Sequence, residues 1–431
     1  MSSTLSNLEY IKYIEPHLAL KIVEFLMKQN STDEVKSLYK NLSIKTLNYD
    51  NIQSEKFLSE SELNELKSKN ESEIKQLEEK LKGFLNLSEN CEKQKTYDLN
   101  YFSLGKKIIE QTSPIDILQY STRLFDIKNF DKACIILKSF SNFHENSPKT
   151  KSKAIFALYL LYSIKVLIGE NSEEIEENFE KITESIEQLK NIFDSLFKKA
   201  EFDSVDRVQV DFKEILLYRG YLLHWALFMI KHNSALFLDT LFKDKYFSLI
   251  ESSFIYLLKY LIVFSIINGS KKYIMKLKDA ISKKKNFIDK HKDCFIVLLD
   301  NISNSSNSKD ILKNLEECKN IMKNDYFLYE YIELFDKKIK EYILENYIIL
   351  NECINIDDVK FLFNDNEDET KKNLINYIGY FYPNAKIKEE NKNISYEVDE
   401  EEINNYYKIK TDDLYSLTKN MVEFFKENKN N

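Results

Sequence analysis

Residues with the types and spacing that catalysis requires are few in this 431-residue chain. The six glycines are isolated and form neither a GxGxxG nor a GxxxxGK phosphate loop. No CxxC or HExxH motif occurs, and no cysteine–histidine cluster has the spacing of zinc ligands. His224 and His232 lie about two helical turns apart in one apolar stretch, too far to bind one metal ion without help from another helix. The sequence therefore predicts no metal site and no cofactor.

Nucleophilic and acid–base catalysis have little support either. The sequence contains no GxSxG elbow, and Cys318 has no nearby histidine on its own helix. Carboxylate pairs are frequent only because 70 residues are acidic, so they carry no information about general acid–base catalysis. A triad assembled from distant segments stays open, but these absences together favour a protein that is not an enzyme and has no catalytic residues.

One basic stretch could contact RNA phosphates. Nine lysines and two aspartates crowd residues 271–292, and Lys283, Lys284 and Lys285 are the candidates for such contacts. The alternative is a solvated helical face in a chain whose basic residues are nearly all lysine. We favour this alternative because charge runs are usually solvated, and direct RNA contact is left open.

The composition favours helices joined by short polar loops. Hydrophobic residues make up 43% of the chain and charged residues 31%, enough for a large core and a soluble surface. Strand-rich folds need frequent turns with Gly or Pro, but the chain has only six Gly and four Pro. Its formal net charge of −8 argues against a protein whose main role is to bind nucleic acid.

The cytoplasm is the expected location. The five cysteines are scattered and odd in number, which fits free thiols in a reducing compartment. The N-terminus lacks a basic region followed by an apolar core, so we expect no secretory signal. The apolar runs 221–230 and 254–267 are too short, or carry a charge, for a membrane span, and they predict buried helices and no membrane partner.

Apolar residues recur with helical spacing near the N-terminus. Residues 8–28 predict an amphipathic helix, and Pro16 suits a first turn, where its missing N–H has no cost. Residues 55–85 are highly charged and have one narrow apolar seam, formed by Ile74, Leu77, Leu81 and Phe84. This segment predicts a coiled-coil-like or hairpin helix, or alternatively a solvated helix without a partner.

From residue 113 onward, the predicted helices follow one another in pairs. Ser113 and Pro114 open one helix, and Phe130 begins the next. Further helical patterns cover 152–168, 173–199, 209–232, 234–243, 246–268, 271–290 and 309–321. Stacked helix pairs of this kind bury a continuous core.

The pattern changes after residue 350. The sequence predicts a short extended piece at 353–356, helices at 357–363 and 367–382, and strands at 385–388 and 394–398. Strand, helix, helix, hairpin is the order of a winged helix, and an amphipathic helix at 411–427 follows it. The predicted fold class is therefore all-α: a right-handed, tetratricopeptide-like helical-repeat array, a winged-helix module and a C-terminal helix.

Two surfaces of this C-terminal part predict contact with other proteins. We expect strand 394–398 to be an exposed edge, and the last helix to have an uncovered apolar face. The interface candidates are Ile394, Tyr396, Val398, Leu414, Leu417, Met421 and Phe424. Nucleic-acid reading by the winged helix is not expected, because residues 365–402 contain eleven acidic residues and five lysines.

Helical repeats that end in a winged helix resemble the PCI domain, which subunits of the proteasome lid, the signalosome and initiation factor 3 share. Within that group, three parts of the sequence are similar to the e-subunit family of eukaryotic translation initiation factor 3. They are residues 17–26 with 38–42, the segment 222–228 that contains the only tryptophan, and residues 315–328 continuing to 353–356 and 384–387.

This resemblance implies a non-catalytic scaffold that joins other initiation factor 3 subunits, namely c, d and l, and helps to hold the factor on the small ribosomal subunit. It implies three regions: helical repeats at 1–208, a PCI domain at 209–400 (helical to 340, winged helix at 341–400) and a tail at 401–431. The alternative is a PCI scaffold of the proteasome lid or signalosome; segments 222–228 and 315–328 favour the initiation factor. An unrelated helical-repeat adaptor would lack the winged helix.

Overall fold

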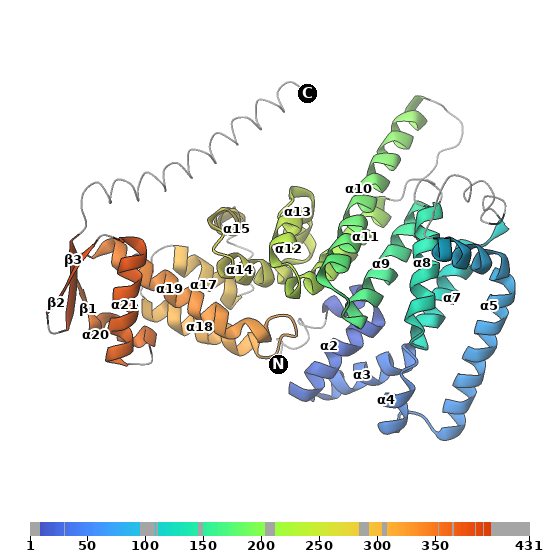
Figure 1. Ribbon diagram of the computed structural model, residues 1–431, viewed down its shortest axis with the longest axis horizontal. Helices are drawn as coiled ribbons and strands as arrows, with labels where there is room; N and C mark the ends of the chain where they lie inside the picture. The colour runs from blue at the N-terminus through green and yellow to red at the C-terminus, as the bar shows by residue number, and fades with distance from the viewer. Residues whose placement is uncertain are drawn as a thin grey trace. The chain divides into compact units, whose positions relative to one another are not determined.

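The structure is a computed structural model, and it describes residues 9–29, 31–94, 108, 111–144, 150–202, 212–283, 293–303, 308–351, 353–363, 366–383, 385–390 and 392–397. Over these residues the chain is mostly helical, with one three-stranded sheet near the C-terminus (Figure 1). The chain divides into two compact units. Unit 1 comprises Met1–Ile296 and Glu317–Ile332, and unit 2 comprises Val297–Glu316 and Glu333–Asn431.

Unit 1 begins with a short 3-10 helix, η1 (Glu9–Tyr13), followed by α2 (Pro16–Gln29). The single helix predicted over 8–28 is therefore divided, and α2 begins at the predicted Pro16. The carboxylate of Glu15 explains this start, because it accepts the backbone N–H groups of His17 (2.7 Å) and Leu18 (3.2 Å). These first-turn donors have no partner within the helix. Helices α3 (Asp33–Lys45) and α4 (Tyr49–Ser54) follow.

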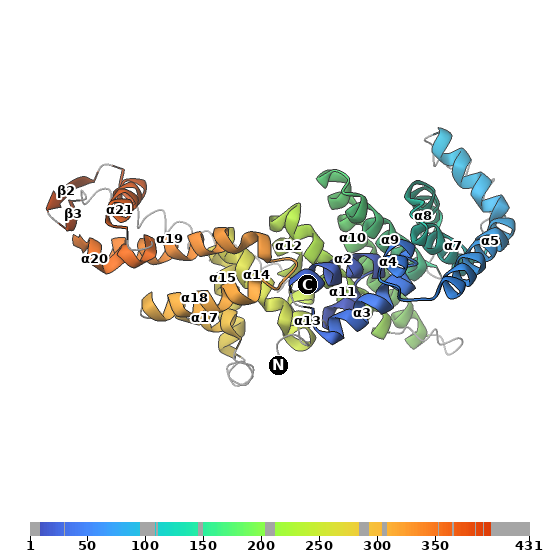
Figure 2. The same cartoon turned by 90° about the horizontal axis from the view of Figure 1, so that it is seen from below.

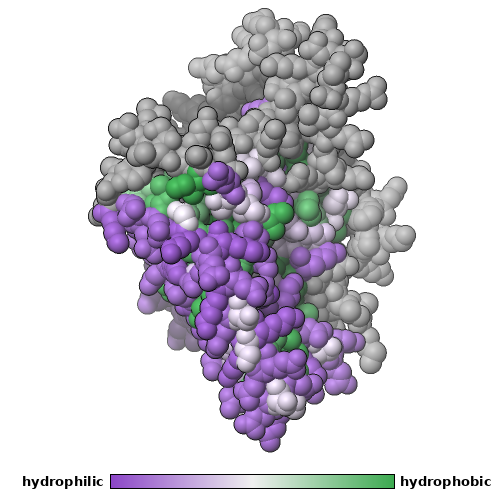
Figure 3. Space-filling view, turned by 90° about the vertical axis from the view of Figure 1, so that its right-hand side faces the viewer, coloured by the Kyte–Doolittle hydropathy of each residue, from purple (hydrophilic) through white to green (hydrophobic). Residues whose placement is uncertain are grey.

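The charged segment predicted over 55–85 is one long helix, α5 (Glu60–Gln94). Its apolar seam is covered: Leu77, Leu81 and Phe84 are buried in a core shared with α7 (Pro114–Asp126) and α8 (Phe130–His144). A solvated helix without a partner is therefore excluded. Figure 3 looks onto the side of the molecule where α5 lies, and the coloured surface there is mostly hydrophilic.

Helices α7 to α10 pack as sequence neighbours, each against the next (Figures 1 and 2). The predicted start of α7 is confirmed, because Pro114 is its first residue and the Ser113 side chain accepts the N–H of Asp116 as an N-cap. Phe130 begins α8, also as predicted. The next helices are α9 (Lys151–Ile168), α10 (Ser172–Phe202) and α11 (Phe212–Trp225).

The later helices of unit 1 are shorter. They are η2 (Ala226–Lys231), α12 (Ser234–Leu241), α13 (Asp244–Ser253), η3 (Ile255–Leu257), α14 (Leu258–Ile267) and α15 (Lys271–Lys283). The continuous helix predicted over 246–268 is wrong, because the chain turns by 115° at Phe254. The turn lets the Phe254 ring pack edge-on against His224 and Tyr13, with ring centroids 5.0 and 5.4 Å away. No single helix in the described ranges is long and apolar enough to cross a membrane.

The chain continues through α17 (Cys294–Ser303), α18 (Ser308–Met322), η4 (Tyr329–Tyr331) and α19 (Ile332–Leu350). Unit 2 ends, as far as it is described, with β1 (Cys353–Asn355), α20 (Ile356–Val359), η5 (Lys360–Phe363), α21 (Glu367–Phe381), β2 (Lys386–Glu390) and β3 (Asn393–Glu397). The predicted order of strand, helix, helix and hairpin is present. The sheet is antiparallel with strand order β1-β3-β2.

Candidate interaction surfaces

The predicted edge strand is the central strand of the sheet. β3 pairs with β1 through Ile354 opposite Ile394, and with β2 through Ile387 opposite Tyr396. The prediction of an exposed edge at 394–398 is therefore wrong, because the extended piece before α20 adds to the hairpin on the side of β3 that was expected to be free.

The side chains of the two described candidates on β3 lie inside unit 2. Ile394 is fully buried, and Tyr396 is 7% exposed. The Tyr396 hydroxyl donates to the backbone carbonyl of Asn351 (2.9 Å), and its ring stacks on Tyr382. Val398 and the last-helix candidates Leu414, Leu417, Met421 and Phe424 lie outside the described residues.

The outer strand of the hairpin, β2, is paired on one side only within the described part of the chain. Its surface is polar: Lys388 forms an ion pair with Glu397 on β3 (2.5 Å), and Glu389 pairs with Lys371 on α21. A strand paired on one side has backbone N–H and C=O groups available to another chain. The open sheet edge that the sequence pattern predicted for β3 is therefore found at β2.

Part of the lysine-rich stretch holds helices together. On α15, Lys276 donates to the backbone carbonyl of Phe242 and to the Asp244 carboxylate, both at 2.7 Å. The Tyr273 ring stacks on Phe242, with centroids 4.3 Å apart. The side chains of the RNA candidates Lys283, Lys284 and Lys285 lie outside the described residues, so RNA contact stays a prediction.

His224 is held as a neutral, fully hydrogen-bonded side chain. Its Nδ1 lies 2.6 Å from the backbone carbonyl of Gly220, and its Nε2 lies 2.6 Å from the Tyr256 hydroxyl. Burial lowers the pKa of His224 to about 4, against a backbone hydrogen bond that raises it. Within the described ranges, no three His, Cys, Asp or Glu side chains are grouped in a way that could hold a metal ion.

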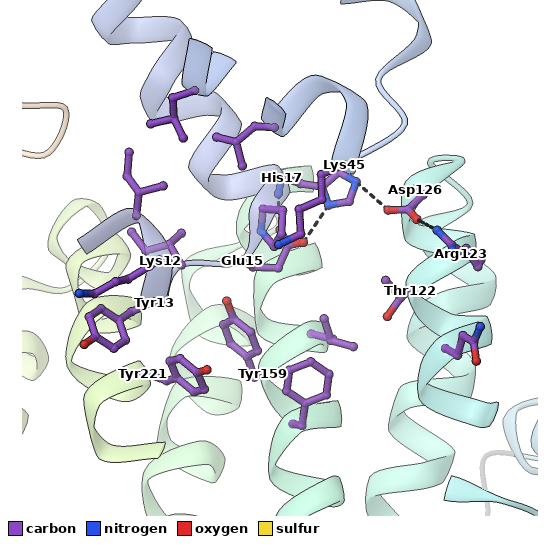
Figure 4. A pocket seen from close by; sticks show the side chains of 18 residues that line it. Lys12, Tyr13, Glu15, His17, Lys45, Thr122, Arg123, Asp126, Tyr159 and Tyr221 are labelled. Carbon is purple, nitrogen blue, oxygen red and sulfur yellow. Dashed lines mark hydrogen bonds and ion pairs between the residues drawn. The ribbon is translucent and has the colours of Figure 1, made fainter. Parts of the chain in front are cut away.

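A hollow of about 770 Å³ lies within unit 1, between the N-terminal segment and helices α3, α7, α9 and α11 (Figure 4). Tyr13, Tyr159 and Tyr221 line one side, and Lys12 and Lys45 also contribute to its wall. The sequence did not predict this hollow, because its walls come from segments that are far apart along the chain.

A chain of charged groups forms another side of this hollow. His17 Nδ1 lies 2.8 Å from a carboxylate oxygen of Glu15, and its Nε2 lies 3.4 Å from Asp126. Arg123 links Asp126 (3.2 Å) to Glu73 on α5 (3.0 Å). The network therefore ties the start of α2 to α7 and α5.

The pKa values in this network are shifted by burial and by the neighbouring charges. Burial raises the pKa of Asp126 to about 6, although the charges of His17 and Arg123 oppose the rise. Burial alone would lower the pKa of His17, but the hydrogen bond and charge of Glu15, together with Asp126, raise it. The proton equilibria of His17 and Asp126 are thus coupled through their contact.

No protein-family model matches the chain. Among curated proteins, it is similar to the e subunit of eukaryotic translation initiation factor 3 from Yarrowia lipolytica, with 22% identity over 269 residues, 60% of this chain and 62% of that protein. It is 27% identical over 180 residues to the e subunit from Phaeosphaeria nodorum, covering 40% of this chain and 41% of that protein. The e subunit from Anopheles gambiae is 26% identical over 178 residues, again 40% and 41%.

The matched regions span less than two thirds of each relative's own length. These relatives come from two fungi and a mosquito, and all have the same name. The resemblance to the e subunit of eukaryotic translation initiation factor 3, expected from the sequence motifs, is thus confirmed at modest identity.

Proposed function

We propose that this chain is a non-catalytic scaffold subunit of the eukaryotic translation initiation factor 3 complex and acts in the cytoplasm. The observation that carries the proposal is the shared similarity to e subunits of this factor from distant organisms. The mostly helical fold, with strand, helix, helix and hairpin as the last elements of its described part, supports it.

In this proposal, helical repeats lead into a PCI domain at 209–400, and β1, α20, α21, β2 and β3 form its winged helix. The partners are other initiation factor 3 subunits, with c, d and l expected, and the small ribosomal subunit, to which the complex recruits mRNA and initiator tRNA. Because β3 is central, we assign sheet extension to β2 (Lys386–Glu390), whose outer side has no strand partner within the described residues.

Affinity purification of the tagged full chain from its native cells tests this function. We expect the other initiation factor 3 subunits to co-purify, and the tagged chain to sediment with small ribosomal subunits. Co-purification of proteasome-lid or signalosome subunits instead would replace the proposal with the alternative scaffold role. A chain that purifies without any of these subunits would contradict both.

A further inference from the structure

The hollow of unit 1 is lined mainly by apolar side chains, some buried and some only half-buried. Ile11, Ile14, Leu42 and Leu160 are buried in its wall, and Tyr159 is 6% exposed. Tyr13, Leu38, Phe156 and Tyr221 also line the hollow and are only half-buried. An apolar concavity with a few polar groups is the usual form of a site that receives a large apolar side chain.

The carboxylates of the hollow are already engaged. Glu15 accepts the N–H groups that begin α2 and contacts His17, and Asp126 contacts His17 and Arg123. The side chains of Glu15 and Asp126 are each only 4% exposed. Neither carboxylate therefore presents a free negative charge to an incoming molecule.

Two exposed cations remain at this hollow, Lys12 and Lys45. Neither forms an ion pair with any residue that the structure describes; Lys12 lies over the Tyr13 ring, with its Nζ 5.1 Å from the ring centroid. The accessible charge beside the apolar wall is thus positive, on a chain whose formal net charge is −8.

We propose that this hollow binds a short segment of a partner protein that places a large apolar side chain against Tyr13, Leu38 and Tyr221 and acidic side chains beside Lys12 and Lys45. The inference rests on the apolar wall and the charge complementarity, and it does not depend on the initiation factor role.

The wall fits an apolar side chain better than an RNA base. Bases need an open aromatic face for stacking, but all three tyrosines already stack on other rings. Tyr159 and Tyr221 stack on Trp225, with centroids 3.5 and 5.8 Å away, and Tyr13 stacks on His224 at 4.5 Å. Two lysines also supply few of the phosphate contacts from which most RNA affinity arises. By contrast, two carboxylates that flank the apolar side chain of a partner segment could each pair with one of the two cations, Lys12 and Lys45.

Trp225 provides a specific readout for this hollow. It is the only tryptophan of the chain, is fully buried, and stacks on Tyr159, which lines the hollow. Occupation of the hollow should therefore change the fluorescence of Trp225, and no other tryptophan contributes to the signal.

The test uses the full chain and a phage-displayed library of short random peptides. We expect enrichment of peptides in which a large apolar residue is flanked by Asp or Glu. Those enriched peptides that contain no tryptophan should produce a saturable change of Trp225 fluorescence. Lys12→Glu combined with Lys45→Glu should weaken their binding about tenfold, since each exposed ion pair contributes modestly. Lys40→Glu, also on α3 and exposed but outside the hollow, is the matched control and should change affinity less than about twofold.

Several results would overturn the proposal. These are a library without enrichment, enriched peptides without acidic residues, or equal binding to the double variant and to the Lys40→Glu control. If oligouridylate gives a saturable change of Trp225 fluorescence and the peptides give none, the ligand of the hollow is single-stranded RNA and not a peptide. Circular dichroism of both variants checks that the exposed substitutions leave the fold intact.

Discussion

The ring of Tyr159 on α9 stacks on the indole of Trp225 on α11, with centroids 3.5 Å apart and planes inclined by 11°. Tyr221 stacks on the same indole at 5.8 Å. The apolar run 221–230 was expected to be a buried helix, and Trp225 within it is fully buried. We therefore propose that Trp225 is a structural anchor of unit 1. These rings join two helices whose sequences lie about sixty residues apart.

Removal of this anchor should destabilise unit 1. We expect Trp225→Ala to lower the free energy of unfolding by about 3–5 kcal/mol, because it removes a large buried side chain and leaves a cavity. Urea unfolding followed by far-ultraviolet circular dichroism measures the change without needing the tryptophan. Tyr380→Ala is the control, since Tyr380 is 77% exposed and its loss should change stability by less than about 0.5 kcal/mol. Equal effects of the two substitutions would contradict the anchor role.

A buried ion pair supplies a second prediction. Lys259 on α14 lies 2.7 Å from Asp325, with the two side chains 7% and 2% exposed, and the Tyr260 hydroxyl donates to the same carboxylate (2.9 Å). Lys259→Met should destabilise the fold by about 3–5 kcal/mol, because it leaves a buried charge without its cation. Adding Asp325→Asn should recover part of that loss, since the amide carries no charge. If the double variant is less stable than Lys259→Met alone, the ion pair is not the cause.

The sequence predicted helices well where local signals mark their ends. Ser113 and Pro114 cap and open α7, and Phe130 begins α8, at the predicted positions. The break at Phe254 was missed because residues on both sides of it are apolar, so helical periodicity continues across the turn. The turn is stabilised by packing of Phe254 against His224, which lies thirty residues earlier.

The candidate surfaces were less predictable, because they depend on which distant segments meet. The hairpin of β2 and β3 follows from local pattern, but nothing local indicates that β1 lies against β3 rather than leaving it exposed. The contact of His17 with Asp126 joins residues more than a hundred positions apart and has no spacing signature. Burial of Trp225 was predictable because its own segment is apolar on nearly every side.

Stability should depend on pH through His224. Its folded pKa of about 4 lies below the ordinary value of about 6.5, so the unfolded chain binds a proton between these values and the folded chain does not. The contribution of His224 is fully present above pH 6.5 and is lost as pH falls toward 4. We expect protonation of His224 to lower the free energy of unfolding by up to about 3 kcal/mol as pH falls from 6.5 to 4.

Comparison with His224→Phe isolates this effect. Asp126 contributes a pH dependence of stability with the opposite sign. Its pKa is raised to about 6, so protonated Asp126 stabilises the fold at low pH, and this stabilisation is lost as pH rises through 6. Asp126 is present in both proteins, so its effect cancels in the difference. Chemical unfolding at several pH values should show a smaller loss of stability for the variant between pH 6.5 and 4. Parallel pH profiles for the two proteins would exclude His224 as the titrating group.

Two thiols should form a disulfide under mild oxidation. Cys294, at the start of α17, and Cys318, on α18, place their sulfur atoms 3.4 Å apart. Each loses one hydrogen when diamide, a two-electron oxidant, is reduced to its hydrazine, and a bond of about 2.05 Å then joins the sulfurs. Mass spectrometry of the digested protein should detect the 294–318 link. Cys318→Ser should abolish it and Cys353→Ser, at an exposed cysteine, should not; preferential pairing of Cys294 with another cysteine would contradict the contact.

The outer edge of β2 is the place where assembly should be most sensitive. Proline at Ser395, in the central strand, would disturb pairing with both Cys353 and Lys388, so it cannot separate assembly from folding. The pair of substitutions Ile387→Pro and Lys388→Pro can distinguish a loss of assembly from a loss of folding. Consecutive N–H groups of a strand point to opposite sides, so one substitution removes a donor to β3 and the other removes a donor at the open edge.

We expect the substitution on the open side to keep the thermal unfolding profile of the parent chain and to lose co-purifying initiation factor 3 subunits. The substitution on the inner side should lower the melting temperature, so thermal unfolding tells the two variants apart. Lys386→Ala, on the same strand but with an intact N–H group, is the matched control and should retain its partners, because edge pairing uses the backbone rather than the lysine side chain. If the correctly folded proline variant keeps every partner while deletion of residues 1–110 loses them, the assembly surface lies in the N-terminal helices instead.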